Sequence, residues 1–139
     1  MMKLDAWDKK ILTLLQRNNR LSQREIADRI SLSPSAVNRR IAALEDAGVI
    51  KGSVSLVDAS KVGRPITIMG QVTIENERLD LLEEDIQRFV TCPLVQQVYY
   101  VTGDFDFLLV INVRDMAEYE ALTRELYLAS GNIKSFLTI

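Results

Sequence analysis

One predicted helix in this sequence would carry arginine, asparagine and small side chains on a single face. These side chains can form hydrogen bonds with nucleic-acid bases and phosphates. At about 100° per residue, Ser35, Arg39 and Ala42 share one face, and Asn38 and Arg40 lie at its two flanks. Arginine hydrogen-bonds guanine edges or phosphates, asparagine pairs with adenine, and serine contacts either. These residues predict a helix that lies in the major groove of DNA. The alternative is a solvated helix face that only carries charge.

Two sequence signals mark the start of this helix and of the helix before it. Ser22 and Glu25 have the spacing of a capping box, in which each side chain accepts a hydrogen bond from the backbone amide of the other residue. Ser33 followed by Pro34 is a second signal, because proline at the first helical position loses no hydrogen bond. Gly48 suits the left-handed position just after a helix. Two short helices joined by a three- or four-residue turn predict a helix-turn-helix.

The flanking segments complete a small DNA-binding domain. Asp5 can cap a first helix that ends near Asn18 and covers the apolar stripes of the other two. Residues 49–57 alternate apolar and turn-forming residues, which predicts short extended pieces or a small wing. A lysine in this segment, Lys51, would contact phosphate. The predicted DNA contacts are therefore Ser33, Ser35, Asn38, Arg39, Arg40 and Lys51.

The second half of the chain alternates strands with helices. Their order, β-α-β-β-α-β, predicts a ferredoxin-like α+β domain, with four antiparallel strands and both helices on one face. The expected strands are 66–74, 95–101, 105–113 and 133–139, and the expected helices are 79–90 and 116–128. We predict that the face without helices is largely apolar, and apolar surface of that size normally meets a partner. Dimerisation through this face is therefore expected.

Charge divides along the chain in the same way. Residues 1–64 carry twelve Lys/Arg against seven Asp/Glu, a net charge of +5, and residues 65–139 carry five against twelve, a net charge of −7. Only the first half is suited to a polyanion. We predict a DNA-binding domain at 1–57, a linker at 58–65 and a second domain at 66–139.

Composition excludes several other kinds of protein. The 139 residues include no histidine and a single cysteine, Cys92. An internal disulfide and a cysteine-based metal site are therefore excluded, and the usual general base and the commonest transition-metal ligand are absent. No apolar run approaches the roughly 20 residues of a membrane span, and the first residues lack the apolar core of a signal peptide. We expect a cytoplasmic protein without metal or cofactor.

Several short motifs occur in an order that is known from one family. They are Leu4-Asp5 with Asp8 and Ile11-Leu12, Leu32-Ser33-Pro34, Arg39-Arg40-Ile41, Leu44-Glu45, Gly48-Val49-Ile50, and Val101-Thr102-Gly103-Asp104-Phe105-Asp106. With these motifs, nearly the whole chain resembles the Lrp/AsnC transcription regulators, the feast/famine regulators of bacteria and archaea. The resemblance implies that the second domain binds effectors, usually amino acids, between paired domains, and that the protein forms dimers which often assemble into octamers. Family members usually continue past the position of Ile139, so the resemblance implies a shortened last strand here.

The glycine turn in the last of these motifs is the predicted effector corner. An amino acid needs an anion for its ammonium group and free N–H groups for its carboxylate. Asp104 and Asp106 can supply the anion, and the backbone at Gly103 can be approached closely. The alternative is that the turn only closes a hairpin. The predicted effector contacts are Thr102, Gly103, Asp104, Asp106, Ser135 and Thr138.

The sequence as a whole predicts a transcription regulator that binds specific DNA sites and responds to a small effector, an amino acid by the family resemblance. Two alternatives remain open. Some haem-pathway decarboxylases resemble the same two-domain architecture, so the fold alone does not exclude an enzyme. The absence of histidine and the basic first half argue against that alternative. The other alternative is an effector-binding or assembly module whose DNA-binding half is silent.

Overall fold

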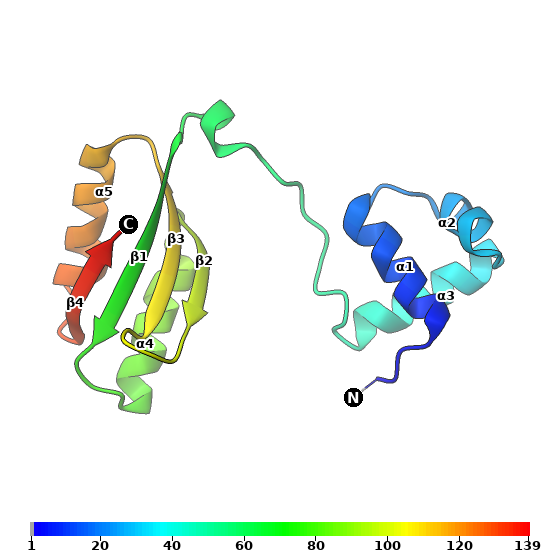
Figure 1. The fold of residues 1–139 in the computed structure, drawn as a ribbon. Coiled ribbons are helices and arrows are strands. Elements are labelled where there is room, and N and C mark those ends of the chain that lie inside the picture. Colours follow the sequence, from blue (N-terminus) through cyan, green and yellow to red (C-terminus); the bar gives the residue numbers. More distant parts are fainter. Residues whose placement is uncertain (1) are drawn as a thin grey trace. The chain divides into compact units, whose positions relative to one another are not determined.

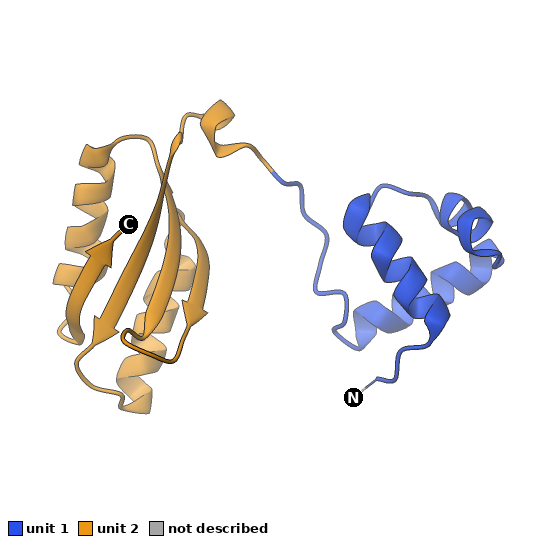
Figure 2. Ribbon diagram, viewed as in Figure 1, with its two compact units in different colours: residues 1–56 blue, residues 57–139 orange. Residues whose placement is uncertain are grey.

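A computed structural model describes residues 2–139 of the chain. Within this range the chain divides between Leu56 and Val57 into two compact units (Figure 2). Each unit has its own hydrophobic core. The predicted linker at 58–65 contains a short 3₁₀ helix, Ala59–Val62, which is capped by the Asp58 side chain.

The first unit is a bundle of three short helices (Figure 1). They are α1 (Ala6–Arg17), α2 (Gln23–Ile30) and α3 (Pro34–Asp46). Asp5 and Ser22 each begin a helix with a complete capping box, and the hydroxyl of Ser33 accepts a hydrogen bond at the start of α3. These local signals confirm the predicted helix starts and the helix-turn-helix.

Apolar side chains from all three helices fill the core of this unit. The buried ones are Ile11, Ile26, Ala27, Ile30, Val37 and Leu44. The chain turns between α2 and α3 at Ser31, whose φ of 59° is left-handed, and it leaves α3 at Gly48, whose φ is 74°. Residues 51–58, the greater part of the predicted extended pieces or wing, form neither helix nor strand. A lone extended segment forms no ladder because it has no neighbouring strand to pair with.

The second unit is an antiparallel sheet with helices on one face. Its strands are β1 (Ile66–Ile74), β2 (Val95–Tyr100), β3 (Phe107–Val113) and β4 (Ile133–Thr138), in the spatial order β2-β3-β1-β4. The helices are α4 (Leu79–Thr91) and α5 (Met116–Thr123), which continues into a π-helical turn, η2 (Arg124–Leu128) (Figure 1). This order confirms the predicted ferredoxin-like domain. No helix within residues 2–139 is both long and apolar enough to cross a membrane.

The strand register separates the two faces of this sheet. Phe107 pairs with Val72 on the face covered by helices, where both side chains are fully buried. Met69 pairs with Val110 on the open face. Polar residues share the open face: Thr67, Gln71, Thr73, Gln97, Asn112 and Ser135. Apolar residues on the same face include Met69, Tyr99, Leu108, Val110 and Leu137. The open face is therefore mixed and not largely apolar as predicted, because only the covered face has to supply the core of its own unit.

The π-helical turn places Tyr127 against the central strand. Its ring packs on Phe136 with centroids 4.5 Å apart, and its hydroxyl is buried without a hydrogen-bond partner in the described part of the chain. A Cβ atom added at Gly70 would lie 2.7 Å from that hydroxyl oxygen. The missing side chain of the glycine is therefore what makes room for the tyrosine.

Candidate DNA-binding face and effector corner

The outer face of α3 is open to solvent, as the helical periodicity predicts. Ser35, Asn38, Arg39 and Ala42 are all exposed, while Val37 on the opposite side is fully buried. No ion pair or hydrogen bond within residues 2–139 engages the Arg39 guanidinium. The centre of the face therefore offers an uncommitted guanidinium group next to small side chains.

Arg40 lies at one flank of this face and contacts α1. Its Nη1 donates hydrogen bonds to Asp5 Oδ2 at 2.7 Å and to Asp8 Oδ1 at 3.0 Å. The hydrogen bond from the Arg40 guanidinium lowers the pKa of Asp5, and the two carboxylates raise the pKa of Arg40. The sequence predicts Arg40 as a DNA contact, whereas the structure gives its guanidinium two partners inside the unit. The reason is that the α1 capping box lies within reach of this flank of α3.

Asn38 lies at the other flank and contacts α2. Gln23, the first residue of α2, donates a hydrogen bond from Nε2 to Asn38 Oδ1 at 2.8 Å. Gln23 is not among the residues that the sequence predicts, because only the packing of α2 against α3 brings its amide to Asn38. Both flanks of α3 are therefore held by side chains of the two neighbouring helices.

The two remaining predicted DNA contacts lie at the ends of α3. Ser33 Oγ accepts a hydrogen bond from the Ala36 amide and lies 3.2 Å from Ser35 Oγ. Ser33 is thus engaged in capping the helix, and its hydroxyl lies next to the hydroxyl of Ser35. Lys51 follows α3 and is exposed.

The predicted effector corner is the connection between β2 and β3. Thr102, Gly103 and Asp104 are exposed there, and the φ of 130° at Gly103 is a conformation that side-chain-bearing residues rarely adopt. Asp106 differs from Asp104, because its Oδ2 accepts a hydrogen bond from the Ile74 amide at 2.8 Å. Asp106 therefore holds the corner to the end of β1, and Asp104 keeps the exposed carboxylate.

The other two predicted effector residues lie on opposite faces of the sheet. Ser135 pairs with Thr73 on the open face, next to the end of β1 that Asp106 contacts. Thr138 pairs with Gly70 on the covered face, and its hydroxyl is hydrogen-bonded to the hydroxyl of Tyr119 in α5. The structure therefore does not bring Thr138 together with the corner.

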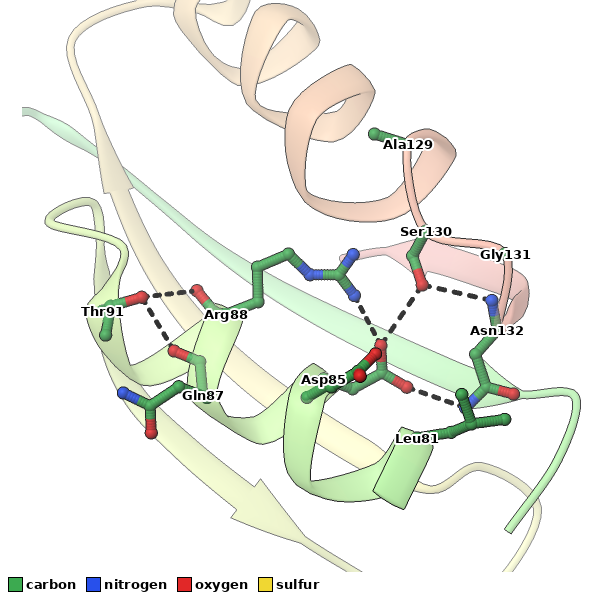
Figure 3. A pocket seen from close by; sticks show the side chains of 10 residues that line it. Leu81, Asp85, Gln87, Arg88, Thr91, Ala129, Ser130, Gly131 and Asn132 are labelled. Atoms are coloured by element: carbon green, nitrogen blue, oxygen red, sulfur yellow. Dashed lines mark hydrogen bonds and ion pairs between the residues drawn. The ribbon is translucent and has the colours of Figure 1, made fainter. Parts of the chain in front are cut away.

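A polar network that sequence analysis missed supports the same end of β1. Asp85 of α4 is buried and accepts hydrogen bonds from Arg88, Ser130 and Asn132 (Figure 3). Asn132 in turn accepts a hydrogen bond from the Asn76 amide and donates one to the Asn76 carbonyl. Asp85, Arg88, Ser130 and Asn132 line a groove of about 700 Å³ beside α4. The network joins α4, the segment before β4 and the chain just after β1.

The helical periodicity of α4 contained a signal for this network. Asp85 lies beside the apolar stripe formed by Leu82, Ile86 and Phe89, and a carboxylate in that position has to find partners when it is buried. No group of three or more acidic, cysteine or histidine residues in the described chain is arranged to hold a metal ion.

A helix-turn-helix joined to a ferredoxin-like domain with a polar hairpin corner is typical of a DNA-binding regulator with a separate ligand domain. Comparisons with known families match both halves: the winged helix-turn-helix DNA-binding family over residues 4–51 and the Lrp/AsnC ligand binding domain over residues 67–139. The chain belongs to the Lrp/AsnC family of transcription regulators.

Individual relatives agree with this assignment. An HTH-type transcriptional regulator of Sinorhizobium fredii is 41% identical over 99% of this chain and 82% of its own length. The leucine-responsive regulatory protein of Haemophilus influenzae is 36% identical over 86% of this chain and 72% of its own. A transcriptional regulator of Neisseria meningitidis, solved in complex with L-methionine, has a TM-score of 0.89 at 29% identity and covers 99% of this chain and 88% of its own.

Proposed function

We propose that this regulator binds specific DNA sites through the outer face of α3 and that an amino acid at the corner 102–104 changes this binding. The single observation that supports the DNA-binding role best is the exposed face of α3 with both of its flanks held. The proposal keeps the predicted division into a DNA-binding domain at 1–57, a linker at 58–65 and an effector domain at 66–139. It assigns no catalytic role to the chain and places its action in the cytoplasm.

In the proposed DNA complex the residues of α3 divide their roles by position. Arg39 at the centre of the face contacts a base edge, with Ser35 and Asn38 beside it. Lys51 and the N-terminal end of α3 around Ser33 contact phosphates, which set the register of the helix on the duplex. Arg40 stabilises the angle between α1 and α3 and makes no base contact.

The proposed effector is an amino acid, and the corner offers complementary chemistry. The exposed carboxylate of Asp104 would pair with the ammonium group, and backbone amides near Gly103 would bind the carboxylate. The similarity to a regulator solved with L-methionine supports this ligand class. Asp106 would hold the corner in shape without touching the ligand.

A homodimer is the proposed working unit. One recognition helix covers few base pairs, and a two-fold pair of helices doubles the site. The open face of the sheet, with Met69, Tyr99 and Leu137 about half exposed, is the proposed contact surface. Assembly of dimers into octamers, as the family resemblance implies, is the further proposal.

The DNA-binding role is tested with Arg39→Ala on duplexes selected by the wild type from a random library. The loss should be about 1–3 kcal/mol and should relax preference at one position of the site. Arg124→Ala, which removes an exposed arginine of the second unit, is the matched control and should bind as the wild type does. Wild-type binding that does not weaken with salt on any duplex would contradict the proposal.

The effector role is tested by calorimetry of the full chain against the twenty amino acids. Asp104→Ala should lose the binding that the wild type shows, while Glu120→Ala, at an exposed position in α5, should keep it. Sedimentation of the full chain with and without the bound amino acid measures assembly. If no amino acid binds the wild type, the corner only closes a hairpin.

A further inference from the structure

The contact between Gln23 and Asn38 is a hydrogen bond from α2 to an exposed side chain at one flank of the outer face of α3. Gln23 Nε2 and Asn38 Oδ1 are 2.8 Å apart, and the two residues are separated by fifteen positions in the sequence. Both side chains are exposed, so neither is buried for the sake of the core. The bond therefore acts at the surface that the proposed function assigns to DNA.

This bond engages the oxygen half of the Asn38 amide. An asparagine side chain has one accepting oxygen and one donating NH₂ group, and the pairing with adenine uses both. In the structure the oxygen is turned toward Gln23. The NH₂ group is then the half that remains for a partner outside the unit.

We propose that Gln23 is a specificity-determining residue, which orients the Asn38 amide so that it donates to the DNA. This inference rests on the proposed function, because it requires α3 to lie in the groove. Asn38 then favours a base with a hydrogen-bond acceptor in the major groove, such as guanine O6 or thymine O4. A fixed orientation also lowers the ordering cost of binding, because the side chain loses less rotamer freedom.

Gln23→Glu tests the orientation directly. A carboxylate only accepts hydrogen bonds, so Asn38 must turn its NH₂ group toward residue 23 and its oxygen outward. The preferred base should change to one that donates, cytosine N4 or adenine N6. Glutamate at the first position of α2 is also favourable for the helix, so the variant should fold.

Asn38→Asp also places a hydrogen-bond acceptor at the outward side of position 38. Its carboxylate can still accept from Gln23 Nε2, and the second carboxylate oxygen then faces outward as an acceptor. Both variants should shift preference at the same position of the half-site, by roughly tenfold relative to the wild type. Gln23→Met, which removes the bond at similar volume, should reduce discrimination at that position and add no new preference.

The measurement is selection from a random duplex library by full-length wild type and variants, followed by sequencing. The matched control is Gln16→Glu, the same chemical change in α1, where the amide donates only to the Leu12 carbonyl of its own helix. This control should keep the wild-type profile.

Three results overturn the inference. If Gln23→Glu and Gln23→Met weaken binding to all sequences equally, Gln23 contacts phosphate and sets no preference. If Asn38→Ala relaxes one position and the Gln23 variants leave that position unchanged, the orientation claim fails and the proposed DNA face stands. If Asn38→Ala and Arg39→Ala both keep the wild-type profile, the proposed face itself fails, and the inference fails with it.

Discussion

The recognition face of α3 and the hairpin corner at 101–106 are supported by different kinds of contact. On α3 the supports are side chains at the surface: Gln23 is exposed, and Arg40 retains about 30% of its side-chain exposure. At the corner the supports are partly or fully buried, with the Asp106 carboxylate on the Ile74 amide and the Asp85 network just beyond it.

Because of this difference, the exposed contacts orient side chains, whereas the buried contacts stabilise the fold. Exposed polar contacts contribute little to the free energy of unfolding, since water competes for the same groups. Buried polar groups are costly to leave unpaired. A substitution at Gln23, whose partner Asn38 is also exposed, should therefore change specificity more than stability. Substitutions beneath the corner should change stability first. Asp104 should be the exception at the corner, because it is exposed.

The largest expected effect is that of Asp85→Ala. Its loss leaves the buried amide of Asn132 and the partly exposed guanidinium of Arg88 without their acceptor, so the free energy of unfolding of the second unit should fall by about 3–5 kcal/mol. All four tyrosines lie in this unit and the single tryptophan in the other, so tyrosine circular dichroism during urea denaturation reports the second unit alone. Glu120→Ala, which breaks an exposed pair with Arg124, should cost less than about 0.5 kcal/mol. Equal losses in both variants would contradict the comparison.

The next largest effect is a difference in stability loss between Asp106→Ala and Asp104→Ala. Asp106→Ala removes the acceptor of the Ile74 amide and should lower the stability of the second unit by about 1–3 kcal/mol. Asp104→Ala should leave stability within about 0.5 kcal/mol of the wild type and abolish amino-acid binding. Urea denaturation and calorimetry on the same samples make the measurement. A destabilised Asp104→Ala would show that this side chain also supports the fold.

A smaller effect is expected for Arg40→Met, which keeps much of the side-chain stem. It leaves the buried carboxylate of Asp8 without its cation, so the free energy of unfolding of the first unit should fall, which Trp7 fluorescence measures. Arg39→Met is the matched control: it should keep stability and lose DNA affinity. If both variants lose affinity equally and neither loses stability, Arg40 contacts DNA as the sequence predicts.

The smallest effects concern pH and have opposite signs in the two units. The Arg40 hydrogen bond lowers the pKa of Asp5 from 3.8, so its contribution is present above that value and is lost as pH falls further. Burial raises the pKa of Tyr127 above 10.0, so its contribution is lost only as pH rises beyond about 10. Urea denaturation as a function of pH should therefore show acid sensitivity in the tryptophan signal that Arg40→Met reduces. In the tyrosine signal, Tyr127→Phe should reduce the sensitivity to base.

The parts of the structure that sequence could predict are those set by near neighbours. Capping at Asp5, Ser22 and Ser33 depends on residues three positions away, and all three caps are present. The strand and helix order of the second unit follows from periodicity. The partners of Arg40 lie 32 and 35 positions away, and its flank position alone suited either DNA or α1.

The candidate site was less predictable, because its supports cross between elements. Asp106 finds its donor on β1, 32 positions away, and no local pattern distinguishes it from Asp104. The separation of Ser135 and Thr138 was available from sequence, since residues three apart in a regular strand point to opposite faces. Gln23 was accessible only once the packing of α2 against α3 was known.

The close approach of Tyr127 to Gly70 has a consequence for how this sequence can change over generations. Alanine at position 70 would place a methyl group against the tyrosine hydroxyl, 2.7 Å away. Tyr127→Phe removes a hydroxyl that has no described partner, so it should be tolerated alone. Gly70→Ala should then be tolerated only after that first step. The two positions, 57 apart in the chain, are epistatic, and only one order of substitution avoids a destabilised intermediate.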